Sequence, residues 1–389
     1  MQKVFFFCFF AYFSMSLIGF DENHRNFARM RLHIFNPGHD IALAANKAPF
    51  TAPHAARQLQ HDLAFIAATW ANSDDMVLVD DKTAAKEAVK RLSVCRNTPI
   101  FIEPDNLSFL QNVDVDEVCV WGWDKAIKRQ LADMGIKDKN IIPSDGALET
   151  WRDISGRAWA AENILAPVVE TNERLIGSAR KVLTTGEALS PGYGDAWVLK
   201  SPWSSSGRGV RYVRREQITS HLEGWMKNTI EKQGYLMAEP FYCKILDLAT
   251  EFYSDGKGNV EYLGLSLFET KNGAYVGNII APEERKREAV EKYISLDVLD
   301  EATKSLKNIT EKTLGNSYHG HFGIDMMIVA DPQNGICLHP CVELNLRRTM
   351  GYVALCMQSA PDIKTKVMRI EYDKKYRMRI AESEDEIWR

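Results

Sequence analysis

Two apolar runs near the C-terminus are separated by a strong turn sequence, and this pattern restricts the fold more than any other feature. Residues 331–335 read DPQNG, which is a composition typical of tight turns. The flanking runs therefore predict an antiparallel hairpin. If the five residues form the loop, Ala330 lies opposite Ile336 and Asp325 lies opposite Cys341.

Polar side chains gather on one face of this predicted hairpin. Side chains alternate along a strand, so Glu343, Asn345 and Arg347 share a face. Asp325 joins Glu343 as a diagonal neighbour, roughly 7–8 Å away. Two carboxylates and an amide oxygen are ligands that Mg²⁺ prefers. The alternative is the solvated face of an edge hairpin, and a loop of even length would place Asp325 on the other face.

The same segment also contains Cys337, His339 and Cys341 at alternate positions. These are zinc-binding residue types, but a fourth ligand and the usual CxxC spacing are missing, which favours buried reduced thiols. The seven cysteines of the chain are scattered and odd in number. This argues against a secreted disulfide framework.

The 389 residues provide enough length for two or three domains. Residues 30–150 alternate short apolar strands with helical patterns, which predicts a parallel, doubly wound α/β domain. No GxGxxG follows the first strand, so a dinucleotide site is not supported. Residues 151–389 predict an α+β body with antiparallel strands, whose last hairpin is the one described above.

Lys200 ends an apolar strand and precedes a Ser/Gly-rich loop, residues 204–209 (SSSGRG). Small residues let backbone N–H groups approach phosphate oxygens, and the lysine adds a positive charge. The alternatives are a plain flexible loop and a solvated lysine. The order of lysine and glycines fits neither a P-loop nor a protein kinase. Residues 237–242 (MAEPFY) form another apolar strand that could hold a flat purine.

These motifs occur in an order that resembles the ATP-grasp superfamily over residues 151–355. The resemblance implies a lysine and mobile loop on the triphosphate, an adenine-binding linker, and the ELNLR segment around magnesium. It also implies that residues 30–150 form the domain that precedes the ATP-grasp fold. A mobile lid would span about 190–237.

The resemblance assigns roles to individual residues. Asp325, Glu343 and Asn345 would coordinate Mg²⁺, with Mn²⁺ as an alternative metal. Arg347 would face the transferring phosphoryl group, although Arg348 is an alternative. The expected nucleotide-binding residues are Arg157, Lys200, Ser205, Ser206, Gly207, Gly209, Glu239, Pro240, Phe241, Tyr242 and Asp247. Glu251 is the alternative to Asp247 as the ribose contact.

The implied reaction joins a small-molecule carboxylate to an amine or similar nucleophile, at the expense of ATP and through an acyl phosphate. A phosphotransferase and an ATP-binding regulator are the two alternatives. His39 and Asp40 follow the first strand, where substrates of α/β sheets bind. A capped turn explains the same two residues, and His319 and His321 are weaker candidates.

Residues 1–29 include an apolar stretch at positions 4–20 that resembles a signal peptide or anchor. We favour translation from Met30, because residues 30–40 (MRLHIFNPGHD) read as a natural first strand. The expected location is therefore cytoplasmic, and a membrane is not an expected partner. The net charge of −4 gives no reason to expect a nucleic acid. A homodimer is left open.

Overall fold

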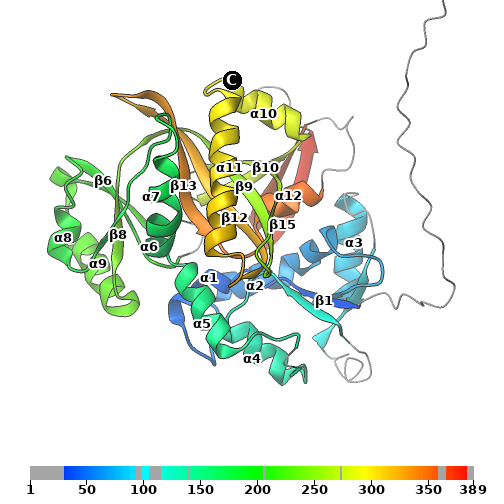
Figure 1. The fold of residues 1–389 in the computed structure, drawn as a ribbon. Helices are drawn as coiled ribbons and strands as arrows, with labels where there is room; N and C mark the ends of the chain where they lie inside the picture. Colours follow the sequence, from blue (N-terminus) through cyan, green and yellow to red (C-terminus); the bar gives the residue numbers. More distant parts are fainter. Residues whose placement is uncertain are drawn as a thin grey trace, which may run out of the picture.

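The computed structural model describes residues 30–92, 98–104, 115–138, 140–204, 207–271, 274–357 and 365–382. The expectations for residues 1–29 and for Ser205 and Ser206 lie outside these ranges. Three β-sheets organise the described chain (Figure 1). Within these ranges, no helix has the length and apolar character needed to cross a membrane.

The first sheet is parallel, as the strand–helix alternation predicts. Its strand order is β3-β2-β1-β4, and Leu32 aligns with both Met76 and Val118. These strands are buried on both faces because helices cover them. The elements are β1 (Arg31–Ile34), α1 (His39–Ala45), α2 (His54–Leu63), a 3-10 helix (Ala64–Thr69), β2 (Met76–Leu78), α3 (Lys82–Leu92), β3 (Ile100–Ile102), β4 (Glu117–Val120) and α4 (Lys125–Asp133).

The second sheet is antiparallel and lies at the far side of the molecule from the first (green, Figure 1). Its order is β5-β8-β6-β7, which brings Lys200 at the end of β6 next to Met237 of β8. Trp197 and Leu199 fill its core beneath α9. Its elements are β5 (Arg180–Val182), α8 (Thr185–Leu189), β6 (Ala196–Lys200), β7 (Val210–Arg214), a 3-10 helix (Arg215–Gln217), α9 (Ser220–Gln233) and β8 (Leu236–Pro240).

Local sequence signals explain the bounds of α9. The hydroxyl of Thr219 accepts a hydrogen bond from the Leu222 N–H at 3.2 Å, which satisfies a free donor of the first turn. Gly234 ends the helix with a φ of 91°, a left-handed conformation that glycine adopts without strain. These two end signals set the bounds of the helix at Ser220 and Gln233.

The third sheet contains seven strands in the order β13-β12-β9-β10-β11-β14-β15. Neighbouring strands in this sheet run antiparallel to each other. The largest apolar cluster lies between this sheet and the helices on its face. Its strands are β9 (Cys243–Asp255), β10 (Val260–Lys271), β11 (Ala274–Ile280), β12 (His319–Asp331), β13 (Gly335–Asn345), β14 (Lys366–Asp373) and β15 (Lys375–Glu382).

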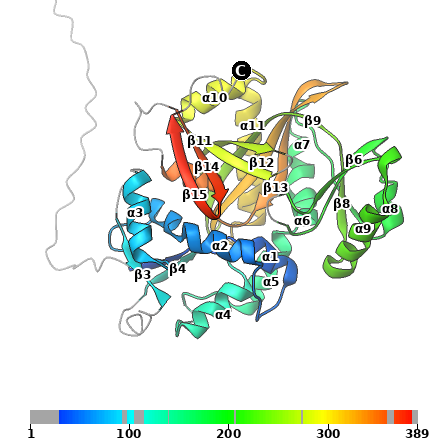
Figure 2. The same ribbon diagram turned by 180° about the vertical axis from the view of Figure 1, so that it is seen from behind.

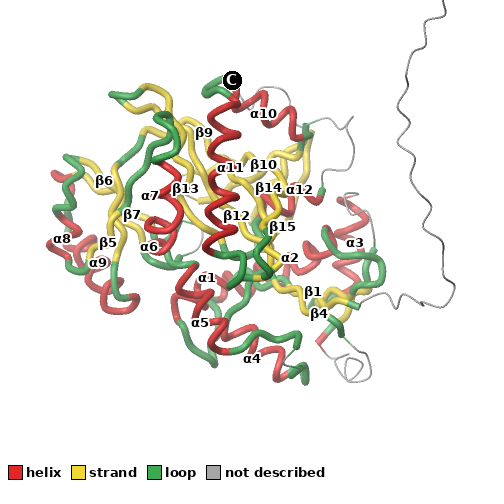
Figure 3. Tube along the Cα trace, in the orientation of Figure 1, coloured by secondary structure: helices red, strands yellow, loops and turns green. Residues whose placement is uncertain are grey.

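Helices link and cover the three sheets (Figure 3). The long α11 packs on the seven-stranded sheet, and a short π-helical turn interrupts the segment between α6 and α7. These elements are α5 (Asp145–Ile154), α6 (Arg157–Ala160), the π-helix (Ala161–Leu165), α7 (Ala166–Val169), α10 (Glu283–Glu291), α11 (Leu296–Thr313) and α12 (Met350–Cys356).

The expectation that β12–β13 is the last hairpin is wrong, because β14 and β15 follow it. They continue the sheet beyond β11 and pack against α2 of the first domain (red beside blue, Figure 2). Met368 and Met378 join the apolar cluster that contains Phe35 and Phe65. The C-terminal strands therefore tie the last part of the chain to the first.

Candidate functional site

The hairpin of β12 and β13 brings Asp325 and Glu343 together, although in a register that differs from the expected one. Ala330 lies opposite Ile336 as predicted, but Asp325 lies opposite Glu343 and not opposite Cys341. The register shifts between Asp325 and Met327, next to the segment of β13 that contains Pro340. Proline has no N–H to donate to the ladder, so a bulge is the expected response.

The shift amounts to two residues, from Cys341 to Glu343, and therefore preserves the face on which each side chain lies. Asn345 lies opposite Gly323, two positions from Asp325 on the same face. The two carboxylates are directly opposite each other instead of diagonal. The predicted cluster is consequently tighter than the regular hairpin would make it.

Asp325 is the most deeply placed carboxylate of this face. Its pKa is raised from the ordinary 3.8 to about 7, first by burial and then by the charge of Glu343, while a hydrogen bond from Asn345 acts to lower it. Glu343 is less buried and forms an ion pair with Arg157 at 2.6 Å. Two opposed carboxylates, one of which pairs with Arg157, form a site that favours a cation.

This donor set suits a hard cation better than zinc. It consists of two carboxylates and an amide oxygen, the oxygen ligands that magnesium takes. Among the described residues, no group of three or more His, Cys, Asp and Glu side chains could hold a metal ion. Cys337, His339 and Cys341 are buried, and the described cysteines are free thiols.

Arg347 connects this face to α1. Its Nε and Nη2 donate to the two oxygens of Asp40 at 2.9 Å each, and Nη2 also donates to the Asn345 Oδ1 at 2.9 Å. Arg348 points elsewhere, because its Nη1 donates to the Val120 carbonyl at 2.5 Å. Of the two arginines, Arg347 is the one beside the carboxylate face.

Lys200 approaches the same face from the second sheet. Its ammonium lies 2.6 Å from the Glu239 Oε2 and donates to the Val342 carbonyl at 3.4 Å. Lys200 is 8% exposed and Glu239 is 6% exposed, so the lysine is not a solvated surface residue. Glu239 therefore stabilises the buried ammonium of Lys200, which also contacts the backbone of β13 at Val342.

Arg157 lies at the start of α6, close to the Ser/Gly loop. Its Nη1 donates to the Ser201 carbonyl at 2.5 Å and to the Ser204 hydroxyl at 3.0 Å. Its buried Nε has no hydrogen-bond partner among the described residues. An orphaned guanidinium N–H is costly unless a ligand satisfies it.

Four further residues expected at the nucleotide are Gly207, Gly209, Pro240 and Phe241. Gly207 has a φ of 71°, and Gly209 has no room for a side chain because an added Cβ would lie 2.3 Å from the Ser204 Cβ. Phe241 is exposed and packs edge-on against Tyr212, with ring centroids 6.0 Å apart. Pro240 ends β8 immediately before it.

Two further expected contacts differ in exposure. Asp247 pairs with Lys244 at 2.5 Å and accepts a hydrogen bond from the Thr270 hydroxyl at 2.6 Å. Glu251 is 2% exposed, and burial raises its pKa to about 8. It accepts a hydrogen bond from Thr349 at 2.6 Å, so it is less suited than Asp247 to contact a ribose.

Tyr242 lies edge-on to His339, with ring centroids 5.5 Å apart. His339 is fully buried, and burial lowers its pKa to about 3. The two weaker histidine candidates also have packed rings. His319 contacts Tyr253 at 2.8 Å between Nε2 and the hydroxyl, and His321 stacks near Tyr352.

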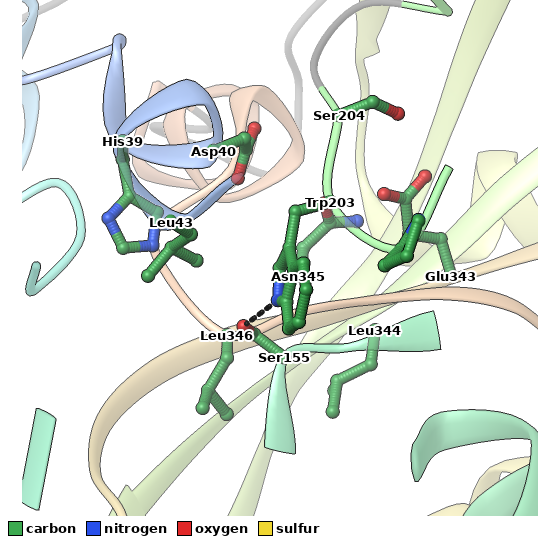
Figure 4. A pocket seen from close by; sticks show the side chains of 11 residues that line it. His39, Asp40, Leu43, Ser155, Trp203, Ser204, Glu343, Leu344, Asn345 and Leu346 are labelled. Atoms are coloured by element: carbon green, nitrogen blue, oxygen red, sulfur yellow. Dashed lines mark hydrogen bonds between the residues drawn. The ribbon is translucent and has the colours of Figure 1, made fainter. Parts of the chain in front are cut away.

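A small cavity lies where the three sheets meet. His39 and Asp40 of α1 and Glu343 and Asn345 of β13 line it, together with Ser204 (Figure 4). The sequence analysis gave His39 and Asp40 as candidate substrate contacts, with a capped turn as the alternative, and did not identify Asp124 as the partner of His39. The short motif NPGHD at a strand end was the only signal available, because a contact across 85 residues leaves no local pattern.

No family model and no curated protein matches the chain. Its structure is similar to N5-carboxyaminoimidazole synthetase from Staphylococcus aureus complexed with ADP. The identity is 15%, the coverage is 89% of this chain and 83% of that chain, and the TM-score is 0.46. It is also similar to the biotin carboxylase of Campylobacter jejuni in a complex with β-γ-ATP, at 12% identity, 88% and 75% coverage and a TM-score of 0.47.

A third similar structure is the biotin carboxylase domain dimer of the 2-oxoglutarate carboxylase from Hydrogenobacter thermophilus, with MgADP, ADP and bicarbonate. The identity is 12%, the coverage is 88% and 74%, and the TM-score is 0.46. These neighbours are a synthetase and two carboxylases with bound adenine nucleotides. At such identities the likeness concerns the fold alone.

Proposed function

We propose that this protein is an ATP- and magnesium-dependent ligase that activates a carboxylate as an acyl phosphate and joins it to an amine or similar nucleophile. The observation that carries the proposal is the partly buried pair Asp325 and Glu343, directly opposite each other and beside Asn345. Two such carboxylates repel each other unless a cation lies between them.

Magnesium fits this donor set, with Asp325, Glu343 and Asn345 as its ligands. Bound there, it would supply charge neutralisation for a triphosphate and its transferring group. Glu343 has a second carboxylate oxygen besides the one that Arg157 contacts. A cation next to Asp325 would lower its raised pKa and would therefore favour the ionised carboxylate.

The cations around the face support binding of a polyanion. Lys200, Arg157 and Arg347 approach it from three different elements, and the Nε of Arg157 lacks a partner. Phosphoryl transfer depends mainly on positioning and on stabilisation of spread negative charge. Each of these side chains would contribute to both, Lys200 and Arg157 on the nucleotide and Arg347 on the acyl phosphate.

A second enzymatic function, transfer of a phosphoryl group that stays on the product, would use the same residues. The position of Arg347 favours the ligase. It lies between the carboxylate face and the first domain, bound to Asp40, where an acceptor could approach an acyl phosphate. A regulator without turnover is disfavoured, because the full set of Asp325, Glu343 and Asn345 is present.

ADP release should be measured across a panel of small carboxylates, with and without amines. For a carboxylate that supports turnover, the substrate should then carry oxygen-18 in its carboxyl group. We expect the label in released inorganic phosphate, since the carboxylate oxygen attacks the γ-phosphorus and leaves with it. Unlabelled phosphate under conditions of product formation would contradict the acyl-phosphate route, and phosphate retained on the product would indicate the phosphotransferase.

A further inference from the structure

Asp40 reaches from α1 to the arginine beside the carboxylate face of β12 and β13. It lies in the first turn of α1. Its two oxygens accept hydrogen bonds from Nε and Nη2 of Arg347 at 2.9 Å each, and the two side chains are 18% and 16% exposed. Burial acts to raise the pKa of Asp40, but the guanidinium of Arg347 lowers it below the ordinary value, so the carboxylate is ionised. Two parallel hydrogen bonds of this kind fix the plane of a guanidinium.

The hydrogen bonds of Arg347 account for most of its N–H groups. An arginine side chain has five of them. Nε and Nη2 each give one to Asp40, Nη2 gives its second to the Asn345 Oδ1 at 2.9 Å, and Nη1 gives one to the Arg348 carbonyl at 3.1 Å. The remaining hydrogen of Nη1 has no acceptor within the described part of the chain. Arg347 can therefore give one hydrogen bond to a ligand while its other bonds hold the side chain still.

One short segment, residues 120–124, supports both members of this pair. On the side of α1, the His39 Nδ1 lies 2.9 Å from the Asp124 Oδ2, and both side chains are 3% exposed. On the side of β13, the Arg348 N–H donates to the Trp121 carbonyl at 2.9 Å. The chain neighbours of both members are therefore bound to the same segment, which gives the pair a fixed frame.

An acidic partner can serve a ligand-binding arginine in two ways, and these change the affinity for an anion in opposite directions. If Asp40 only neutralises the guanidinium, its replacement by a neutral residue should strengthen anion binding, because a negative charge is lost nearby. If Asp40 orients the guanidinium, the same replacement should weaken anion binding, because the freed side chain must be ordered again by the ligand. The two parallel hydrogen bonds and the fixed frame favour orientation.

We infer that Asp40 is a positioning residue that acts through Arg347, by fixing the guanidinium that binds the phosphoryl group of the acyl phosphate. The inference rests on the proposed ligase function and assigns a task in the same site to a residue of α1. Asp40 is then not a substrate contact, because Arg347 occupies both of its oxygens. The part of the chain that forms the parallel sheet thereby contributes to the reaction without touching the substrate.

The test uses inorganic phosphate as the probe, because it presents the same phosphoryl oxygens and does not react with ADP. A phosphorus-31 NMR titration measures its affinity for protein saturated with MgADP. We expect Asp40→Asn to weaken phosphate binding about tenfold, and Arg347→Gln to weaken it at least as much. The affinity for MgADP alone should not change in Asp40→Asn. In the Arg347→Gln background, Asp40→Asn should cause no further loss, since its effect passes through the arginine.

A second variant leaves Asp40 intact. Arg347→Lys keeps the positive charge, but an ammonium cannot form the two parallel bonds, so phosphate affinity should fall to a similar extent. Unchanged affinity in this variant would overturn the inference even if Asp40→Asn does not fold. The matched control is Asp300, which is 56% exposed and accepts from both Nη atoms of Arg287 at 2.6 and 2.8 Å. Asp300→Asn should leave phosphate affinity unchanged.

Tighter or unchanged phosphate binding in Asp40→Asn would overturn the inference, since neutralisation and not orientation would then be the role of the carboxylate. An equal further loss in the Arg347→Gln background would overturn it as well, because Asp40 would then act independently of the arginine. A wild-type protein that binds MgADP but no phosphate would also count against it. A wild-type protein that binds neither MgATP nor MgADP would contradict the proposed function itself, so the two failures are distinguishable.

Discussion

The two edges of the seven-stranded sheet are both antiparallel hairpins with charged residues, but they place these charges in opposite environments. In β12–β13, Asp325 and Glu343 lie opposite each other, and Glu343 lines the small cavity. In β14–β15, Glu371 and Arg379 form an ion pair at 2.5 Å with 49% and 62% of the side chains exposed. The strands of the inner hairpin are largely apolar and buried, whereas those of the outer hairpin are mostly exposed.

The difference shows how to separate a functional face from a solvated one. Charges at the outer edge cost little, because water solvates them whether or not they pair. Charges at the inner edge cost free energy, as the raised pKa of Asp325 indicates. A protein keeps such a destabilising arrangement where it binds a compensating cation, which is the basis for assigning function to the inner edge alone.

The largest expected effect that separates the edges is on turnover. Glu343→Gln and Asp325→Asn should each lower the rate of ADP formation by roughly 10²- to 10³-fold, since an amide cannot neutralise metal charge. Glu371→Gln at the outer edge should leave the rate unchanged. Steady-state ADP release over a magnesium titration measures all three. Wild-type rates and magnesium dependence in either inner-edge variant would contradict the metal assignment.

The next effect concerns the nucleotide. Lys200→Ala should weaken ATP binding at least about tenfold, or about 1.4 kcal/mol, because it removes a buried positive charge beside the face. The exposed Lys227 on α9, 74% exposed, provides the matched control Lys227→Ala. Calorimetric titration of both folded variants with ATP gives the comparison. Equal affinities in the two variants would remove Lys200 from the nucleotide site.

The inner edge was predictable from the sequence where local rules determine it. The turn at residues 331–335 sets the pairing of Ala330 with Ile336, and side-chain alternation sets the common face of Glu343 and Asn345. The bulge near Pro340 was not predicted, and it moves Asp325 from Cys341 to Glu343. Asp325 still lies on the same face as Glu343 and Asn345, because the shift is an even number of residues.

Contacts between distant segments were beyond the reach of these rules. His39 with Asp124 and Arg347 with Asp40 join residues 85 and 307 positions apart. No periodicity encodes such pairs, because they depend on how the sheets pack. The hairpin of β14 and β15 was missed for a related reason, as its strands are mostly exposed on one side and gain their apolar partners from α2 and the first domain.

A smaller effect distinguishes the edges by their dependence on pH. Because the pKa of Asp325 is raised from 3.8 to about 7 in the folded protein, the protonated form is favoured by folding. Its contribution is fully present below about pH 4 and is lost as the pH rises through 7. Asp325→Asn removes this loss, so without magnesium the variant should gain a few kcal/mol over the wild type between pH 4 and 8.

Urea unfolding in EDTA at pH 5 and at pH 8 measures this gain as a difference between the variant and the wild type. Titrations elsewhere in the protein cancel in that difference. Added magnesium should reduce the gain at pH 8, since it stabilises the ionised carboxylate of the wild type. A gain of the same size at both pH values would show that Asp325 is ionised in the folded protein without help from a cation.

The smallest expected effect is at the outer edge. Arg379→Gln removes the partner of Glu371, yet both side chains are largely in water, so the free energy of unfolding should fall by only about 0.2–1 kcal/mol. The loss should shrink in high salt, because mobile ions screen an exposed pair. Urea unfolding in low and in 1 M salt measures both quantities. If this variant lost several kcal/mol instead, the ion pair would be energetically coupled to the packing of β15 on α2. The outer edge would then be a structural element of the domain contact, and exposure alone would not separate the two hairpins.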